Sequence, residues 1–271
     1  MIGTGRTAEI FAWGEDRVLK LFMDWCPHSW IEKEEQLSRV VYESGLPAPE
    51  VEGLIEVDGR RGIIFERVDG GSMLDAMRSN QSGLLRYAEI LADLHASIHS
   101  QEIQSIPSLH NMMESDIRSV KILSEEDKTK ILQVLNQMKD GTVLCHYDFH
   151  PMNVIMSPRG PVIIDWMTAR QGNSHADIAR TLSILQSPIA KSIWQNPKQA
   201  DSLDALHSNG HDVSKLFIDR YLTRYRESCY ISLQEVKAWR LPTAAARLNE
   251  NIPQDRDWLM SIVKKELLCT L

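Results

Sequence analysis

The sequence predicts an α+β fold with two lobes, a small mixed β-sheet lobe followed by a larger, mainly helical lobe. Three observations predict it. Residues 1–68 alternate between strand-like runs and one helical segment, Asp69-Gly70-Gly71-Ser72 releases backbone restraint, and the rest of the chain shows helical spacing of apolar residues apart from one hairpin. We therefore place the lobe boundary between residues 68 and 69.

The N-terminal lobe, residues 1–68, is expected to contain four main strands and one helix. The helix covers residues 29–44 and stops at Gly45-Leu46-Pro47. Within the second strand, Lys20 interrupts an apolar run, which fits either a solvated strand lysine or a buried cation beside a phosphate site. The strands are expected at residues 8–13, 17–22, 51–57 and 61–68.

The C-terminal lobe, residues 69–271, is expected to be helical around the hairpin. His95 lies on the apolar face of its first helix, which is typical of a core histidine. Asp177 begins another helix, where it caps that helix or braces a neighbouring loop. Helices are expected at residues 84–98, 127–138, 177–185, 213–225, 233–250 and 257–268.

The residues that carry chemistry lie between Cys145 and Trp166. Asn153 follows Asp148 by five positions, and Asp165 comes twelve positions later. Two carboxylates and a carboxamide are hard oxygen ligands suited to Mg²⁺. Because Asp-x-x-x-x-Asn is the spacing of a kinase catalytic loop, the pattern predicts phosphate transfer from a nucleotide.

The hairpin after this loop sets the geometry of these groups. Residues 154–156 and 161–164 are apolar strands around a turn at Pro158 and Arg159. Folding about that turn places Asn153 opposite Ile164, with Asp165 diagonally beside it at about 7–8 Å between Cα atoms. One or two Mg²⁺ ions can bridge that separation, which leaves Asp148 on the preceding loop to face a substrate hydroxyl.

Composition narrows the class of protein. The chain has 271 residues, of which 43% are hydrophobic and 25% charged, and its net charge of −7 argues against nucleic acid as a main partner. Its four widely spaced cysteines form no metal or disulfide pattern and fit reduced thiols in a cytoplasmic protein. We expect neither a signal peptide nor contact with a membrane, because no apolar run approaches about 18 residues.

The loop and its surroundings resemble the aminoglycoside phosphotransferase family, which has a protein-kinase-like fold and is related to choline kinases. The resemblance extends from Ile2–Glu9 to Asp177–Arg180 and is most specific in the loop His146–Asn153. His150 stands where protein kinases have a lysine. Ile164-Asp165-Trp166 likewise stands in place of their Asp-Phe-Gly.

The resemblance implies roles for the residues of the loop and hairpin. Asp148 corresponds to the catalytic base that orients the acceptor hydroxyl. His150 either contacts the γ-phosphate or shapes the loop, and His146 has a structural role in hydrogen bonding the loop backbone. Asn153 and Asp165 correspond to the ligands of Mg²⁺.

The resemblance also implies a nucleotide site in the N-terminal lobe. Lys20 corresponds to the lysine that contacts the α- and β-phosphates of ATP. Glu34 corresponds to the helix glutamate that pairs with it, although Glu32 and Glu35 are close enough in sequence to take that place. The remaining residues implied in nucleotide binding are Glu66 and Val68 at the adenine and Gly3 and Gly5 over the phosphates, on a first strand that is very short or absent.

The expected function is ATP- and Mg²⁺-dependent transfer of phosphate to a hydroxyl of a small molecule, either an aminoglycoside or a metabolite such as an amino alcohol or sugar. Residues 182–271 carry 12 Lys and Arg against 10 Asp and Glu, which gives no support for a polycationic acceptor. A protein kinase is the first alternative, and both His150 and the lack of an Ala-Pro-Glu segment argue against it. A nucleotide-binding pseudokinase is the second, although the catalytic groups are all present. The sequence carries no signal for an oligomeric state.

Overall fold

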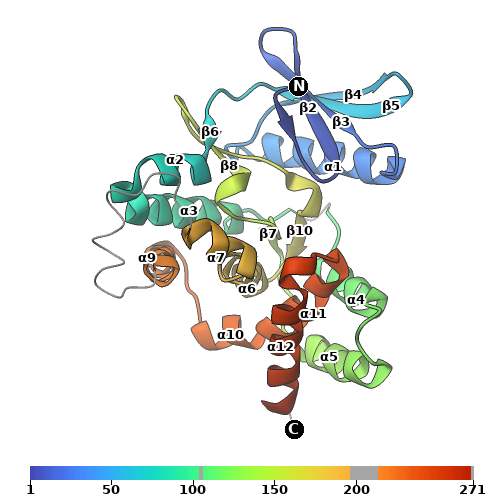
Figure 1. The fold of residues 1–271 in the computed structure, drawn as a ribbon, viewed down its shortest axis with the longest axis vertical. Helices are drawn as coiled ribbons and strands as arrows, with labels where there is room; N and C mark the ends of the chain where they lie inside the picture. Colours follow the sequence, from blue (N-terminus) through green and yellow to red (C-terminus); the bar gives the residue numbers. More distant parts are fainter. Residues whose placement is uncertain (104–105, 196–212, 270–271) are drawn as a thin grey trace. The chain divides into compact units, whose positions relative to one another are not determined.

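The computed structural model describes residues 1–103, 106–195 and 213–269, and the chain forms two compact units (Figure 1). Unit 1 comprises Met1–Ala76 and Pro151–Ala169, and unit 2 comprises Met77–His150 and Arg170–Leu271. The hairpin that follows the catalytic loop therefore groups with the N-terminal elements, and the units do not follow a single cut in the sequence. The division into a nucleotide-binding lobe at 1–68 and an acceptor-binding lobe at 69–271 remains a prediction.

Unit 1 is built on a five-stranded antiparallel sheet in the order β1-β2-β3-β5-β4. Three of the predicted strands have the observed bounds, and the predicted helix is shifted by one residue. The elements are β1 (Gly3–Thr4), β2 (Ala8–Trp13), β3 (Arg17–Phe22), α1 (His28–Glu43), β4 (Val51–Val57) and β5 (Arg60–Glu66).

The alternation of β3 sends its side chains to two different environments. Leu19 and Leu21 pack with Ile64 on one face of the sheet. Phe22 packs on the other face, in a cluster that includes Ile31 of α1, and α1 lies beside the sheet in Figure 1. Because side chains alternate along a strand, Lys20 shares the face of Phe22 and points toward α1.

A second, three-stranded sheet in unit 1 carries the hairpin. Its strands are β6 (Gly71–Ser72), β8 (Val154–Ser157) and β9 (Gly160–Ile163), in the order β6-β8-β9. Val154 pairs with Ile163, and the Ile164 amide donates to the Asn153 carbonyl at 3.0 Å. This confirms the predicted register, with Asn153 opposite Ile164. The short helices of unit 1 are η2 (Pro151–Asn153) and η3 (Trp166–Thr168), and α2 (Met73–Ser79) contains the boundary with unit 2.

Unit 2 is mainly helical. Its two short strands pair antiparallel, and α3 packs along α9. The sequence predicted neither these strands nor the helices α4 and α7. The elements are η1 (Gln81–Gly83), α3 (Leu84–His99), α4 (Leu109–Ser119), α5 (Glu125–Gln137), β7 (Val143–Cys145), β10 (Arg170–Gly172), α6 (Ser174–Leu185), α7 (Pro188–Gln195), α9 (Val213–Ser228), α10 (Leu233–Ala238), α11 (Arg240–Arg247), η4 (Leu248–Glu250) and α12 (Pro253–Cys269).

The helix predicted at residues 233–250 is not continuous. Residues 233–250 form three pieces, α10, α11 and η4, with a break at Trp239. Pro242 explains the break, because it has no amide to donate to the carbonyl four residues earlier and is tolerated only in the first turn of a helix. Among the described helices, none has both the length and the hydropathy that crossing a membrane requires.

Candidate functional site

Unit 1 contains a buried ion-pair cluster around Lys20. Its ammonium donates to Oε1 of Glu34 at 2.5 Å and to Oδ1 of Asp165 at 2.9 Å. The Glu34 side chain is 1% exposed, whereas that of Asp165 is 41% exposed. Of the three glutamates considered from sequence, Glu34 is thus the partner of Lys20, and the other two pair with Arg61 and Arg39.

The protonation of this cluster follows from burial and charge. Burial alone would lower the pKa of Lys20, but the nearby carboxylates of Asp165 and Glu34 outweigh it and raise that pKa. Burial raises the pKa of Glu34 more than the charge of Lys20 lowers it. Lys20 therefore stays charged throughout the physiological range, beside one buried carboxyl and one accessible carboxylate.

Asn153 and Asp165 supply the oxygen donors of this region. Asn153 ends η2 and is 8% exposed, and the backbone pair between Asn153 and Ile164 sets the strand position immediately before Asp165. Asp165 has φ 66° and ψ 62°, so the backbone turns sharply there. A carboxamide and an accessible carboxylate at adjacent strand ends are ligands that Mg²⁺ prefers, and the residues present therefore fit that ion.

The segment expected to bind adenine begins at Glu66, the last residue of β5. The amide of Glu66 donates to the carbonyl of Glu50, and that of Arg67 donates to the carbonyl of Asp16, both at 2.9 Å. The Glu66 carboxylate accepts two hydrogen bonds from Arg159, at 2.5 and 2.8 Å, and these bonds lower its pKa. The side chain of Glu66 and the amides of Glu66 and Arg67 are therefore all engaged within unit 1.

A cleft of about 260 Å³ borders the Glu66–Arg159 pair, and none of the ion-pair cluster or the predicted metal ligands lines it. Gly3 lies in β1, whose two residues realise the expected very short first strand, and Gly5 lies in the turn to β2, where its amide donates to Ala8. A Cβ at either glycine would approach no atom closer than 3.6 Å. Sterics alone therefore do not require glycine there.

Unit 2 contains His146–His150 of the predicted catalytic loop, and one face of α6 holds this part of the loop. Asp177 accepts the amides of His146 and Tyr147, at 2.7 and 2.9 Å. Arg180 donates through Nε to the carbonyl of Tyr147 at 3.1 Å, and the hydroxyl of Thr181 donates to the carbonyl of Phe149 at 3.0 Å. Because positions i, i+3 and i+4 share a helix face, these three side chains of α6 together contact His146, Tyr147 and Phe149 of the loop.

The conformation of Tyr147 explains why the loop needs this support. Its φ is 59°, in the left-handed region that residues other than glycine rarely adopt. Such a residue costs roughly 1–3 kcal/mol and persists only where its surroundings hold it. Here Asp177 holds the amide of Tyr147 and Arg180 holds its carbonyl, so α6 fixes the strained residue immediately before Asp148.

Asp148 is accessible and stays ionised. Its side chain is 30% exposed, with Oδ2 3.6 Å from Nε2 of His150 and Oδ1 3.4 Å from the guanidinium of Arg180. Burial would raise the pKa of Asp148, but the interactions with His150 and Arg180 outweigh it and hold that pKa well below its usual range. The amide of Asp148 donates to Nδ1 of His146, in line with the structural role expected of that histidine.

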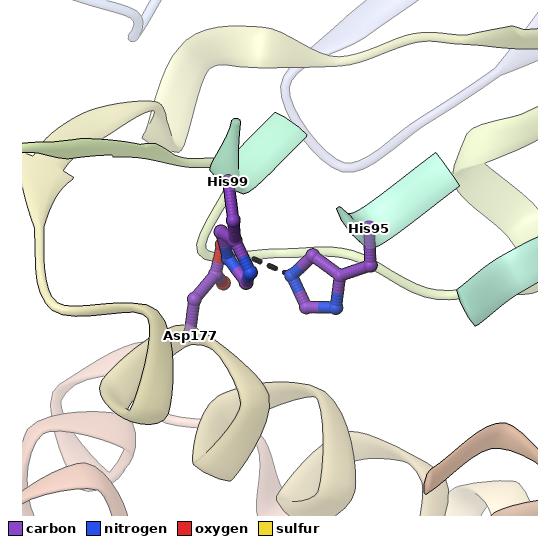
Figure 2. A group of neighbouring side chains, drawn as sticks. All are labelled: His95, His99 and Asp177. Carbon is purple, nitrogen blue, oxygen red and sulfur yellow. Dashed lines mark hydrogen bonds and ion pairs between the residues drawn. The ribbon is translucent and has the colours of Figure 1, made fainter. Parts of the chain in front are cut away.

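Behind the loop lies a buried polar cluster that sequence reasoning found only in part. Figure 2 shows His95 and His99 of α3 directed at Asp177, with Nε2 of each 3.2 Å from its carboxylate. The hydroxyls of Tyr221 and Tyr225 meet the other ring nitrogens at 2.6 and 2.7 Å. Asp177 is thus a brace for the loop, while the side chain of Asn173 caps α6. His95 is fully buried, as expected.

The structure divides the predicted site residues between the two units. Asp148 and His150 lie in unit 2. The missed contributors are Arg180 and Thr181, and their signal in the sequence is the spacing of polar residues after Asp177 along one helix face. The predicted residues in unit 1 are Gly3, Gly5, Lys20, Glu34, Glu66, Val68, Asn153 and Asp165.

Comparison with known proteins gives two findings and one negative result. The sequence profile of the phosphotransferase enzyme family matches residues 8–206. Solved structures of aminoglycoside phosphotransferases and choline kinases are similar to the chain over most of its length. A search among curated protein sequences found none that matches.

Three solved structures show the extent of the similarity. An aminoglycoside 3′-phosphotransferase of type VIII is 18% identical with a TM-score of 0.58, covering 89% of this chain and 94% of its own. An aminoglycoside phosphotransferase from Streptomyces rimosus, in complex with ADP and streptomycin, is 18% identical with a TM-score of 0.55, covering 85% and 86%. A choline kinase from Streptococcus pneumoniae is 12% identical with a TM-score of 0.61, covering 99% and 92%. At these identities the similarity establishes the fold, and it confirms the predicted protein-kinase-like α+β class.

Proposed function

Because the chain belongs to the phosphotransferase enzyme family, we propose that it uses Mg²⁺ and ATP to phosphorylate a hydroxyl of a small molecule, with Asp148 directing the acceptor. The observation that carries the proposal is the cluster of Lys20, Glu34 and Asp165, joined through one ammonium. A buried lysine between a helix carboxyl and an accessible carboxylate fits a phosphate site that also holds a divalent cation.

Asp148 acts mainly by orientation. A carboxylate with so low a pKa is a weak base, so it does not remove the hydroxyl proton in the ground state. Phosphoryl transfer passes through a loose transition state in which the acceptor forms little bonding early. Asp148 therefore holds the hydroxyl in line by accepting its hydrogen bond, and it receives the proton late.

The residues of unit 1 bind the nucleotide. Asn153 and Asp165 would hold Mg²⁺, which would neutralise charge on the phosphates. Lys20 contacts the α- and β-phosphates, and Glu34 fixes its ammonium in place. Main-chain groups of Glu66 and Val68 bind adenine, and the turn containing Gly3 and Gly5 covers the phosphates. In unit 2, His150 either contacts the γ-phosphate or shapes the loop around Asp148.

The acceptor is proposed to be a metabolite such as an amino alcohol or sugar. The named structural relatives include enzymes for aminoglycosides and choline. An aminoglycoside is a polycation and needs clustered acidic side chains. Here Glu227, Glu235 and Glu250 each face a different basic side chain, Arg224, His175 and Arg180 respectively, so they do not form such a cluster. The four free cysteines fit a reducing compartment, which supports a cytoplasmic location.

The test is a coupled ADP-release screen over aminoglycosides, amino alcohols and sugars with Mg²⁺ and ATP. We expect one acceptor class to stimulate release, EDTA to abolish it, and Asp148→Asn to lower kcat about 10²–10⁴-fold. Asp140→Asn, at an exposed residue of unit 2, is the matched control and keeps wild-type kcat. Normal turnover by Asp148→Asn would refute the proposal, as would phosphate transfer to proteins alone.

A further inference from the structure

Arg180 is a buried cation whose guanidinium makes three separate polar contacts. Its side chain is 7% exposed. One terminal nitrogen pairs with Glu250 of η4, the other lies 3.4 Å from Oδ1 of Asp148, and Nε donates to the carbonyl of Tyr147. The guanidinium also lies 5.2 Å from the centre of the Tyr147 ring. A single side chain thus connects α6, η4 and the catalytic loop within unit 2.

The cost of burying this charge shows what each contact does. Burial would lower the pKa of Arg180, but Glu250 and Asp148 outweigh it and raise that pKa. A buried guanidinium needs a close counter-charge, and Glu250 supplies it. With Glu250 as its closest counter-charge, Arg180 is held in place and presents its remaining nitrogen to Asp148.

We propose that Arg180 is a positioning residue for Asp148: its guanidinium, 3.4 Å from Oδ1, restrains the orientation of the carboxylate toward the acceptor hydroxyl. Glu250 in turn holds the guanidinium. The planar, forked guanidinium suits this task, because it restrains the carboxylate and the Tyr147 carbonyl together, which a lysine ammonium cannot do in one geometry. The inference rests on the proposed function, in which Asp148 directs the acceptor.

Electrostatics gives a second consequence. The charged or titratable groups of unit 2 that lower the pKa of Asp148 include His150, Arg180 and His146. Glu250 lies behind Arg180, and Asp116 of α4 lies within electrostatic range of both. Removing the guanidinium would take the neighbouring arginine away from Asp148, whereas Glu250 would keep Arg247, whose Nε lies 3.9 Å from its Oε2. A carboxylate without that cation is more readily protonated, so the pKa of Asp148 would rise.

The experiment compares Arg180→Met, Arg180→Lys and Glu250→Gln with the wild type, and Arg226→Met on the exposed face of α9 is the control. Steady-state kinetics gives kcat and the KM for ATP. NMR of protein labelled with ¹³C at aspartate carboxyls gives the titration of Asp148 directly, without turnover. We expect Arg180→Met to lower kcat about 10–100-fold with the KM for ATP little changed, because misorientation costs rate more than nucleotide binding.

The NMR titration of Asp148 separates the positioning effect of Arg180 from the effect of its charge. Arg180→Met should move the Asp148 midpoint upward, whereas Arg180→Lys should restore that midpoint but only part of kcat. Glu250→Gln should give a kcat between that of the wild type and that of Arg180→Met. If Arg180→Met does not fold, Arg180→Lys and Glu250→Gln carry the comparison.

Two results distinguish failure of this inference from failure of the proposed function. Wild-type turnover with Arg180→Met no slower than Arg226→Met would overturn the inference and leave the function standing. A wild type that releases no ADP with any acceptor would refute the function. In that case an unchanged Asp148 titration in Arg180→Met would also overturn the positioning of Asp148 by Arg180, and a raised midpoint would support it.

Discussion

At the scale of the residue, Lys20 links the stability of unit 1 to its chemistry. Its ammonium is the counter-charge of Glu34, which is 1% exposed, and it also contacts Asp165. Under the proposed function, the residue that contacts nucleotide phosphate is thus also the partner of a buried carboxyl. A substitution of Lys20 should therefore change both the stability of unit 1 and its activity, so the two have to be measured separately.

We expect Lys20→Met to lower the free energy of unfolding by about 3–5 kcal/mol, because it leaves a buried carboxyl without its partner. Urea denaturation at pH 7.5 measures the loss. The double variant Lys20→Met/Glu34→Gln should recover much of it, since it removes both charges. Lys215→Met, at an exposed lysine of α9, should change stability by no more than about 0.5 kcal/mol. Equal losses in Lys20→Met and Lys215→Met would contradict the buried pair.

Sequence reasoning found Lys20 but not Arg180, and the difference has a physical cause. A lysine within an apolar strand conflicts with its local surroundings, so it stands out from sequence alone. Arg180 lies in a helix, and charged residues are common in helices. Nothing in the local sequence therefore shows that its side chain is buried. Its partners Glu250 and Tyr147 are 70 and 33 residues away along the chain. Only the fold brings them together.

At the scale of the element, prediction succeeded where a local rule decides the structure. The turn at Pro158 and Arg159 fixes the hairpin register, since a one-residue slip would reverse the faces of both strands. β7 and β10 have three residues each and pair across 25 residues, so no local pattern marks them. α4 was missed although its signals are local: Ser108 caps it, and Leu109, Met113 and Ile117 form its buried face.

The Gly70-Gly71 pair shows another limit of local rules. Two glycines predict a free hinge, but β6 starts at Gly71 and pairs with β8. Gly70 has φ 143°, and a Cβ there would lie 2.4 Å from the carbonyl oxygen of Met156. The first glycine is therefore needed for close approach of two backbones, and the second is not.

We expect Gly70→Ala to lower the free energy of unfolding by about 1–3 kcal/mol, because the methyl group meets a backbone carbonyl at a strained φ. Gly71→Ala is the matched control. Its backbone is outside the left-handed region, and a Cβ would meet its nearest neighbour, Asp75, at 3.8 Å, so its stability should stay within about 1 kcal/mol of the wild type. Urea denaturation compares the two, and similar losses would mean that the contact with Met156 is unimportant.

At the scale of the whole molecule, each compact unit contains two separate stretches of the chain. Sequence reasoning recovered the fold class because strand-rich and helix-rich regions differ in periodicity. It did not recover the grouping of the hairpin with the N-terminal sheet, because that grouping depends on pairs such as Gly71 with Met156, which are far apart in sequence. The matching family profile and the similar solved structures identify the protein-kinase-like fold, which periodicity alone does not specify.

The stability of the molecule in mild acid should depend on the buried cluster behind the catalytic loop. Burial and the charge of His99 lower the pKa of His95 to about 4, against about 6.5 for an ordinary histidine. Between these values the unfolded chain binds a proton that the folded chain does not. The free energy of unfolding should therefore fall as the pH drops from 6.5 toward 4, by up to about 1.4 kcal/mol per pH unit from this group.

Replacing His95 tests this assignment. Urea denaturation of His95→Gln at pH values from 7.5 to 4.5 should show a shallower loss of stability than the wild type, although its stability at pH 7.5 is lower. Asp177 does not obscure the result: burial would raise its pKa, but the two histidines hold it well below the usual range, so its own loss of stability comes at more acid pH. His28→Gln, at the exposed start of α1, should keep the wild-type slope. If His95→Gln kept that slope as well, the acid sensitivity would arise outside the cluster that supports Asp148.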